Sequence, residues 1–283
     1  MRNKKVKQTG QSKLHAFFGL LLIAGVGTML YPRFSQWINT RHQDKVVDSY
    51  ITQTEEYTDE NLIEMREKAV RYNEKLAQST VVMTDPFSEE AVTISEKEYE
   101  DTLRVNEEGL MGIVTIDSIS VRLPIYHGTS EEVLSKAVGH LQGTSLPIGG
   151  ENTHSVLSAH TGMASARLFT DLPKMKEGDI FILTALGEDI AYKVYEIEVL
   201  LPEEIDSLSI QDDRDLATLI TCTPFGVNSH RLLVYGERTE LSQEEMSEIL
   251  EGKEVDYLFL GLVVIAFVAF VVLVGVLRRR GKR

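Results

Sequence analysis

Two long, uncharged apolar runs lie near the ends of the chain, at residues 14–31 and 257–277. Each approaches the about 20 residues that a helix needs to cross a bilayer, so the pattern predicts a transmembrane helix at each end. Five Lys or Arg residues precede the first run and five follow the second. Because positive charge stays on the cytoplasmic side of the cell membrane, we expect both termini in the cytoplasm. The region between the two runs is then expected to be extracellular. The alternative for the first run is a cleaved signal peptide, although no convincing small-residue cleavage motif precedes Pro32.

Between residues 57 and 78 the apolar positions repeat at alternating steps of three and four. They are Leu62, Met65, Ala69, Tyr72 and Leu76, with Asp59 and Glu60 near the start. This spacing is typical of an amphipathic helix, and acidic residues in its first turn favour it. We expect the helix to be a structural brace that packs on the main domain.

From residue 112 onwards the pattern changes to short apolar runs broken by Gly, Pro, Asn and Asp. The runs lie at 113–116, 121–125, 155–159, 180–183, 190–195, 216–221 and 232–235. Their length and close spacing predict a mainly β fold, an all-β barrel or sandwich. Short helical pieces are expected at 130–136 and 164–172, and an acidic linker or helix at 243–255. The polar passage 79–95 is expected to be poor in regular structure.

Composition and charge narrow the choice of partners. The chain has 283 residues, 43% of them hydrophobic, which is enough for one sizeable core or two small ones. Acidic residues are absent from 1–31 and 257–283, so the region between carries 19 Lys and Arg against 43 Asp and Glu, a net charge of −24. Such an acidic external region argues against nucleic acid or anionic lipid as a partner.

The single cysteine, Cys222, ends an apolar run, and a turn-rich loop separates it from Arg231. One strand would hold the sulfur rigidly, and the next would bring the Arg231 guanidinium back beside it. A further apolar run leads to His160. Cysteine, histidine and arginine supply a nucleophile, an acid/base and an oxyanion donor, which are the groups that acyl transfer needs.

The alternative reading of Cys222 is a small buried hydrophobic residue. A solitary cysteine outside the membrane has no internal disulfide partner, and the histidine and arginine around it favour a reactive thiol. One cysteine and scattered histidines show no metal-ligand spacing, so we expect neither a metal nor a cofactor. His230 adjoins Arg231, but neighbouring residues of a strand face opposite sides, so His230 should face away from the site.

These residues resemble the sortases, whose pattern is a histidine, then Thr-Leu-x-Thr-Cys, then an arginine that closes the next strand. Residues Thr218–Cys222 match the pentapeptide, and the runs Leu157–Gly162 and Cys222–Arg231 are similar to the class C, or pilin-polymerising, branch. The resemblance covers roughly residues 109–238. It implies an eight-stranded β-barrel with short helices, and His160, Cys222 and Arg231 as catalytic residues.

A tripeptide in the polar passage, Asp85-Pro86-Phe87, gains meaning from the same resemblance. By itself it is a turn, because Pro86 restricts the residue before it to extended conformations. The resemblance implies a lid, in which Asp85 pairs with Arg231 and Phe87 covers Cys222.

The resemblance implies a membrane-anchored cysteine transpeptidase. Its partners would be pilin and surface proteins with Leu-Pro-x-Thr-Gly-like (LPXTG) sorting signals, cleaved between Thr and Gly, and an acceptor pilin whose lysine receives the acyl group. The alternatives are a sortase that anchors proteins to peptidoglycan and a non-enzymatic surface scaffold. The expected order is a cytoplasmic tail (1–13), a transmembrane helix (14–31), an extracellular helical region with the lid (32–108), the catalytic barrel (109–238), a linker (239–256), a transmembrane helix (257–277) and a cytoplasmic tail (278–283).

Overall fold

The computed structural model describes residues 4–79, 85–88, 97–163 and 165–251. Residues 33–252 form one compact unit, and residues 1–32 belong to a second one. Helix α1 extends over Lys4–Glu56 and contains Pro32. The apolar run 14–31 lies in α1, but within the described ranges no helix combines the length and apolar character that crossing a membrane requires. The run 257–277 lies outside the described residues.

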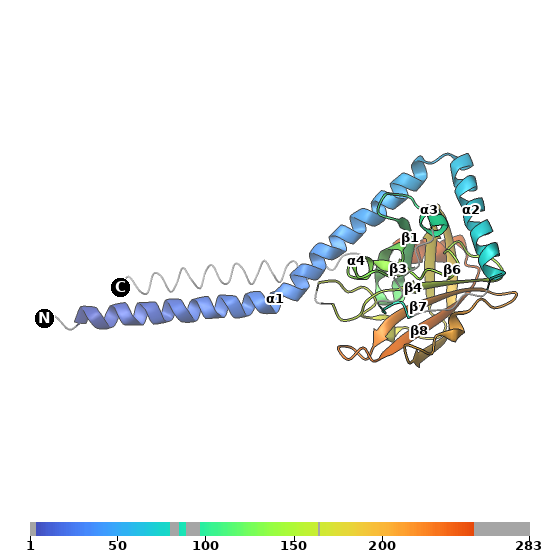
Figure 1. Cartoon of the computed structure of the whole chain (residues 1–283). Helices are drawn as coiled ribbons and strands as arrows, with labels where there is room; N and C mark the ends of the chain where they lie inside the picture. Colours follow the sequence, from blue (N-terminus) through green and yellow to red (C-terminus); the bar gives the residue numbers. More distant parts are fainter. Residues whose placement is uncertain (1–3, 80–84, 89–96, 164, 252–283) are drawn as a thin grey trace. The chain divides into compact units, whose positions relative to one another are not determined.

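The unit 33–252 is built on a closed barrel of eight strands, as the resemblance implied (Figure 1). Around the barrel the strands follow the order β1-β2-β3-β4-β7-β8-β6-β5. The pairs β2/β3 and β4/β7 are parallel, and all other neighbours are antiparallel. The strands are β1 (Leu110–Ile116), β2 (Val121–His127), β3 (Val138–His140), β4 (Thr153–Ser158), β5 (Ile180–Ala185), β6 (Glu188–Leu200), β7 (Asp215–Thr223) and β8 (His230–Arg238). Each predicted run corresponds to a strand, whereas the three-residue β3 was not predicted.

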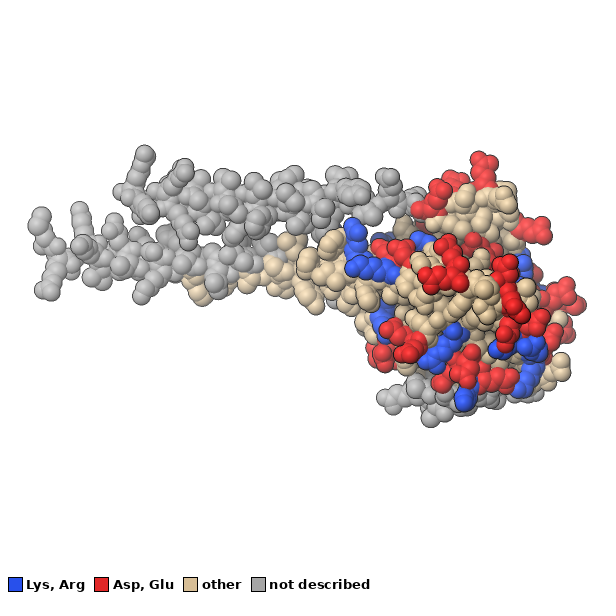
Figure 2. Space-filling model, turned by 90° about the horizontal axis from the view of Figure 1, so that it is seen from above, with Lys and Arg blue, Asp and Glu red and all other residues tan. Residues whose placement is uncertain are grey.

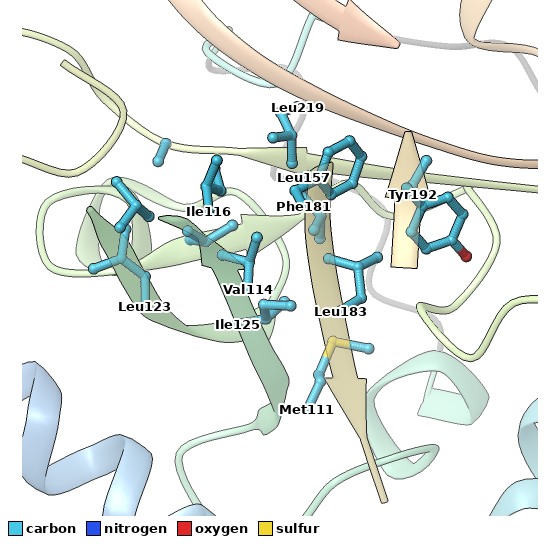
Figure 3. Close-up of a cluster of buried hydrophobic side chains, with 14 of the residues drawn as sticks. Met111, Val114, Ile116, Leu123, Ile125, Leu157, Phe181, Leu183, Tyr192 and Leu219 are labelled. Carbon is cyan, nitrogen blue, oxygen red and sulfur yellow. The ribbon is translucent and has the colours of Figure 1, made fainter. Parts of the chain in front are cut away.

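The core inside the barrel comes from alternate residues of its strands. Leu157 of β4, Leu183 of β5 and Leu219 of β7 meet there (Figure 3). Because side chains alternate along a strand, the residues between them point outward. On β4, β7 and β8 most of these outward residues are buried as well, which explains why apolar residues there occupy both faces instead of strictly alternating with polar ones.

A second apolar group covers the outer face of β4, β7 and β8, and we call it the outer cluster. Two of its residues come from the connection between β6 and β7. Its members are Leu141, Val156, Ile205, Leu208, Ile220, Leu233 and Tyr235. Cys222 lies two residues beyond Ile220, so its side chain emerges on the same outer face.

Helix α2 (Asp59–Ala77) confirms the predicted amphipathic helix. The Thr58 side chain caps its N-terminus by accepting from the backbone N–H of Asn61. Ala69 and Tyr72 are buried in the barrel core, and the remaining predicted apolar positions, Leu62, Met65 and Leu76, pack against it. The short helices are α3 (Lys97–Asp101), α4 (Glu131–Leu134) and α5 (Gln243–Glu251).

The helix expected at 164–172 was wrong. The described residues there form turns, and a single 3-10 turn covers Leu172–Lys174. Leu168 has a φ of 42°, which lies outside the right-handed helical region. The local apolar pattern favoured a helix, but the loop between β4 and β5 has a backbone conformation that is incompatible with one.

Charged side chains on the unit 33–252 are mostly acidic and dispersed. On the face that Figure 2 shows, Asp and Glu side chains are spread widely, with Lys and Arg scattered among them. This arrangement is that of a solvated acidic surface. The expectation that nucleic acid is not a partner stays a prediction.

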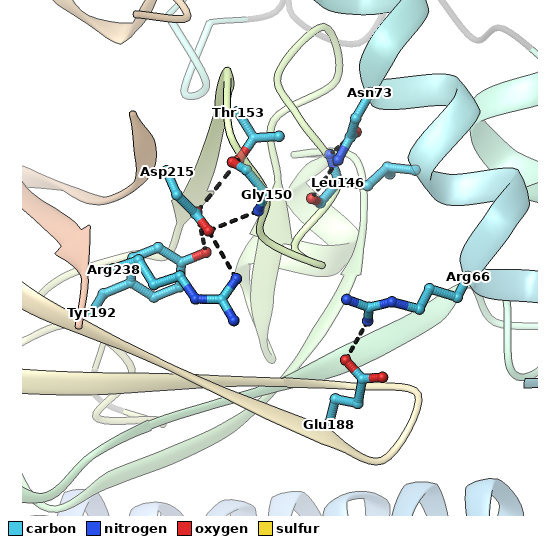
Figure 4. Close-up of polar contacts among 9 residues, drawn as sticks. All are labelled: Arg66, Asn73, Leu146, Gly150, Thr153, Glu188, Tyr192, Asp215 and Arg238. Atoms are coloured by element: carbon cyan, nitrogen blue, oxygen red, sulfur yellow. Dashed lines mark hydrogen bonds and ion pairs between the residues drawn. The ribbon is translucent and has the colours of Figure 1, made fainter. Parts of the chain in front are cut away.

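Asn73 links α2 to the loop before β4 (Figure 4). Its side chain accepts from the Leu146 N–H at 2.8 Å and donates to the Leu146 carbonyl at 3.2 Å. Asn73 is buried and accepts from the Leu146 N–H, whereas the Leu146 carbonyl also accepts from the Ile148 N–H at 2.8 Å. In the described part of the chain the Leu146 N–H is therefore the group that depends on Asn73.

We predict that Asn73→Ala lowers the free energy of unfolding by about 2 kcal/mol, because the Leu146 N–H loses its hydrogen-bond partner and the Leu146 carbonyl keeps only the one from Ile148. Urea unfolding followed by tryptophan fluorescence or circular dichroism measures the effect. Glu67→Ala, an exposed site on the same helix, is the control and should stay within about 0.5 kcal/mol of wild type. Equal unfolding curves for both variants would show that Asn73 does not secure this loop.

Candidate active site

Cys222 stands near the end of β7, directly opposite Arg231 of β8. The two residues are Cα partners in the antiparallel β7/β8 pair, and the next pair along is Thr223 and His230. Partners of an antiparallel pair point to the same face, so the Cys222 sulfur and the Arg231 side chain share the outer face of the barrel. Cys222 is 7% exposed and its thiol is free.

The loop between β7 and β8 makes this pairing possible. The backbone N–H groups of Val227 and Asn228 both donate to the Pro224 carbonyl at 3.0 Å, which closes the turn. Gly226 and Asn228 have φ values of 77° and 58°, in the left-handed region that these residue types tolerate. The Asn228 carbonyl also accepts from Arg231 Nη1 at 3.1 Å, so the loop helps to orient the guanidinium.

His160 follows the end of β4 at the same end of the barrel. β4 runs parallel to β7, with Ser158 opposite Ile220, and the Thr221 hydroxyl donates to the Ala159 carbonyl at 2.7 Å. The carboxyl ends of β4 and β7 therefore lie together and bring His160 to the region of Cys222. Within the described residues no hydrogen bond joins His160 to Cys222; instead His160 Nε2 lies 3.0 Å from Glu131 Oε2 of α4.

Asp85 holds Arg231 through two hydrogen bonds. Arg231 Nε donates to Asp85 Oδ1 at 2.8 Å, and Nη2 donates to Oδ2 at 2.6 Å. The side chains are 8% and 12% exposed, so the pair is largely shielded from water. This is the contact that the resemblance implied, and its role as part of a lid stays a prediction.

Phe87 lies between the two basic residues. Its ring centre is 5.1 Å from the Arg231 guanidinium carbon and 5.6 Å from the His160 ring centre. Phe87 also packs against the outer cluster, and Pro86 beside it is buried. The tripeptide thus lies against Arg231 and His160. That Phe87 also covers Cys222 stays a prediction.

The surroundings of Cys222 disfavour its thiolate. Burial raises the pKa of the Cys222 thiol above its usual value, Arg231 opposes this rise, and Asp85 adds to it. Burial lowers the pKa of Arg231, but the hydrogen bonds to Asp85, together with the charges of Cys222 and Asp85, raise it overall. With Asp85 in place, the positive charge that would stabilise a thiolate is already paired.

The other histidines of the barrel have structural contacts. Burial lowers the pKa of both His140 and His154 to about 4, so both are neutral. His140 contacts the Tyr99 hydroxyl at 3.0 Å, and His154 the Thr218 hydroxyl at 2.7 Å. His230 contacts the Ser229 hydroxyl, and its place next to Arg231 on β8 puts it on the opposite strand face, as predicted.

Comparisons with known proteins point to one family. A family model described as "Sortase domain" matches residues 114–239. Sortase D of Bacillus subtilis is 30% identical over 131 residues, which cover 45% of this chain and 63% of that protein. Sortase C-1 of Actinomyces oris has a crystal structure that matches with a TM-score of 0.61 and 45% identity, covering 64% of this chain and 99% of that one. For a Streptococcus pneumoniae sortase C structure, the TM-score is 0.64 and the identity 40%, covering 70% and 97% of the two chains.

The chain belongs to the sortase family of cysteine transpeptidases. The two solved sortase C chains are matched over almost their whole length, whereas the match spans less than two thirds of the B. subtilis protein. The fold and the pairing of Cys222 with Arg231 thus agree with the motif order in the sequence.

Removing the tripeptide contacts should expose and activate the thiol. We predict that Asp85→Ala combined with Phe87→Ala accelerates alkylation of Cys222 at neutral pH, up to about tenfold for each unit by which the thiol pKa falls. The physical reason is that Asp85 raises the pKa of Cys222 and pairs with the charge that opposes this rise.

The measurement is the pseudo-first-order rate of iodoacetamide labelling as a function of pH. Glu177→Gln, an exposed carboxylate in the loop before β5, is the control and should leave the rate unchanged. Equal rates in wild type and the double variant would mean that the tripeptide is only a turn.

Proposed function

We propose that the protein is a pilin-polymerising sortase. It cleaves LPXTG-like sorting signals between Thr and Gly and transfers the acyl group to a lysine amine of an acceptor pilin. The observation that carries the proposal is the placement of Cys222 opposite Arg231, with Asp85 and Phe87 against the guanidinium. The solved S. pneumoniae sortase C is described in terms of pilin substrate specificity, which supports the same substrate class here.

In the acylation step, the Cys222 thiolate attacks the carbonyl carbon of the signal's Thr. Arg231 stabilises the oxyanion, and the C–N bond to Gly breaks as His160 gives a proton to the leaving amine. The products are a thioacyl enzyme and a peptide that begins with Gly.

In the second step, a lysine amine attacks the thioacyl carbon. His160 accepts a proton from the amine, the C–S bond breaks, and the Cys222 thiolate is restored. The new isopeptide bond joins two pilin subunits, and no oxidant, metal or nucleotide is needed.

The described conformation suits a resting enzyme. Asp85 accepts from Nε and Nη2 of Arg231, Nη1 donates to backbone carbonyls, and burial raises the pKa of the Cys222 thiol. Substrate entry therefore requires the tripeptide to move away first. The apparent affinity for a sorting signal falls in proportion to the fraction of molecules that are open.

The test of the function is a thioacyl adduct on Cys222. We predict that wild type, incubated with a panel of Leu-Pro-x-Thr-Gly peptides, gains the mass of the acyl fragment on Cys222. Neither Cys222→Ala nor His160→Ala should form the adduct, because the first lacks the sulfur and the second the proton donor. Intact-protein and peptide mass spectrometry measure it.

His230→Ala is the matched control, since His230 lies on the opposite strand face, and it should keep most of the activity. A His230 variant as inactive as the His160 variant would reassign the acid/base. A lysine-bearing pilin peptide or a wall-peptide amine is then added to the thioacyl enzyme. Transfer of the acyl group to the pilin lysine supports pilin polymerisation, and transfer to the wall-peptide amine supports anchoring to peptidoglycan.

We further infer that the catalytic barrel is held outside the cell membrane by the apolar segments 14–31 and 257–277. The support comes from their lengths and from the basic residues that flank them on the sides of the two termini.

Tags at both termini should accordingly resist external protease in intact cells from which the wall has been removed, while the region 33–252 is digested. A cytoplasmic protein in the same cells is the control for membrane integrity. An accessible N-terminal tag, or a mature chain that starts near Pro32, would contradict the two-span arrangement.

A further inference from the structure

The Glu131 carboxylate lies near the site but takes no part in the two acyl-transfer steps. Glu131 Oε2 lies 3.0 Å from His160 Nε2. Glu131 is the first residue of α4, whose N-terminus is capped by the Ser130 side chain. The Glu131 side chain is 78% exposed and that of His160 is 23% exposed, so the pair lies at the rim of the site.

The charged and titratable groups of the site come from four segments of the chain. Asp85 of the tripeptide is already bonded to Arg231 of β8, and Cys222 of β7 supplies the thiol. Glu131 of α4 is the carboxylate that contacts the imidazole. Glu132, the next residue, pairs with Lys136 at 3.4 Å and is therefore engaged elsewhere.

An imidazole has two nitrogens, and the hydrogen bond that one makes sets the task of the other. A carboxylate only accepts, so Nε2 must carry the hydrogen that it donates to Glu131. Nδ1 then remains to exchange a proton. The same hydrogen bond fixes the orientation of the ring, so its loss would leave Nδ1 free to turn away from the Cys222 thiol.

We propose that Glu131 is a positioning residue for His160, which holds Nε2 so that Nδ1 exchanges protons with the Cys222 thiol and the substrate amines. Glu131 itself does not touch the reacting atoms. The proposal rests on the proposed function for its substrate amines, but its effect on the thiol requires no substrate.

The expected effect is moderate because the pair is partly exposed to solvent. Exposed ion pairs contribute little, whereas a hydrogen bond to a charged group contributes more. We therefore expect a loss on the order of tenfold without Glu131, in contrast to the complete loss expected for His160→Ala.

The experiment measures iodoacetamide alkylation of Cys222 in the full chain, solubilised in detergent, with no peptide present. Rates are recorded over the range in which thiols titrate, about pH 6 to 10. The variants are Glu131→Ala, Glu131→Gln and the matched control Glu132→Gln, which removes the neighbouring carboxylate of the same helical turn.

Glu131→Ala should lower the rate at neutral pH on the order of tenfold, because the ring is no longer held with Nδ1 available to take the thiol proton. Glu131→Gln should fall between Glu131→Ala and wild type, because the amide oxygen still accepts from Nε2–H but carries no charge. Glu132→Gln should match wild type. With a sorting peptide, Glu131→Ala should lower kcat and leave KM unchanged, since the substrate is not contacted.

An alkylation profile of Glu131→Ala identical to that of Glu132→Gln overturns the proposal. If Glu131→Ala does not fold, the alkylation profile of Glu131→Gln is the test. A Glu131→Gln profile equal to that of wild type also overturns the proposal. If wild type forms no thioacyl adduct but the order of alkylation rates holds, the proposed function fails and the role of Glu131 stands.

Discussion

The pairing of β7 with β8 is the constraint on which the rest of the site depends. Cys222 is opposite Arg231 in the same register that pairs Ile220 with Leu233 in the outer cluster and Leu219 with Val234 inside the barrel. A slip of one residue in either strand would turn a buried apolar residue to the wrong face and separate the sulfur from the guanidinium. The packing that stabilises the barrel therefore also fixes the reactive pair, so the site needs no separate scaffold.

The ion pair of Arg231 with Asp85 sets the condition for opening the site. Both side chains are largely buried, and an uncompensated buried charge is costly. Withdrawal of Asp85 is therefore favourable only if water or a substrate group replaces it on the guanidinium. On the proposed function, the sorting signal supplies this replacement as its carbonyl approaches Arg231. Opening and substrate binding are then coupled through one charge rather than through a distant hinge.

Much of the barrel followed from local sequence patterns, because seven of its strands carry apolar runs and the periodicity of α2 extends over several turns. β3 was missed because Val138–His140 is too short for any pattern, and its extended state comes from pairing with β2 and β4. The order of His160, Cys222 and Arg231 could be recognised for a related reason: each lies within two residues of the end of a strand whose pattern is local. Their catalytic roles remain predictions.

Glu131 shows what a single sequence does not reveal. It is 29 residues from His160, and only the fold brings α4 next to the end of β4. Its position also separates it from the tripeptide, since α4 is attached to the barrel through the buried Leu134. Movement of Asp85 and Phe87 would release Arg231 while Glu131 stays on His160. On the proposed roles, opening frees the oxyanion donor and removes Phe87 from both basic residues, while the hydrogen bond to Glu131 keeps the acid/base in place.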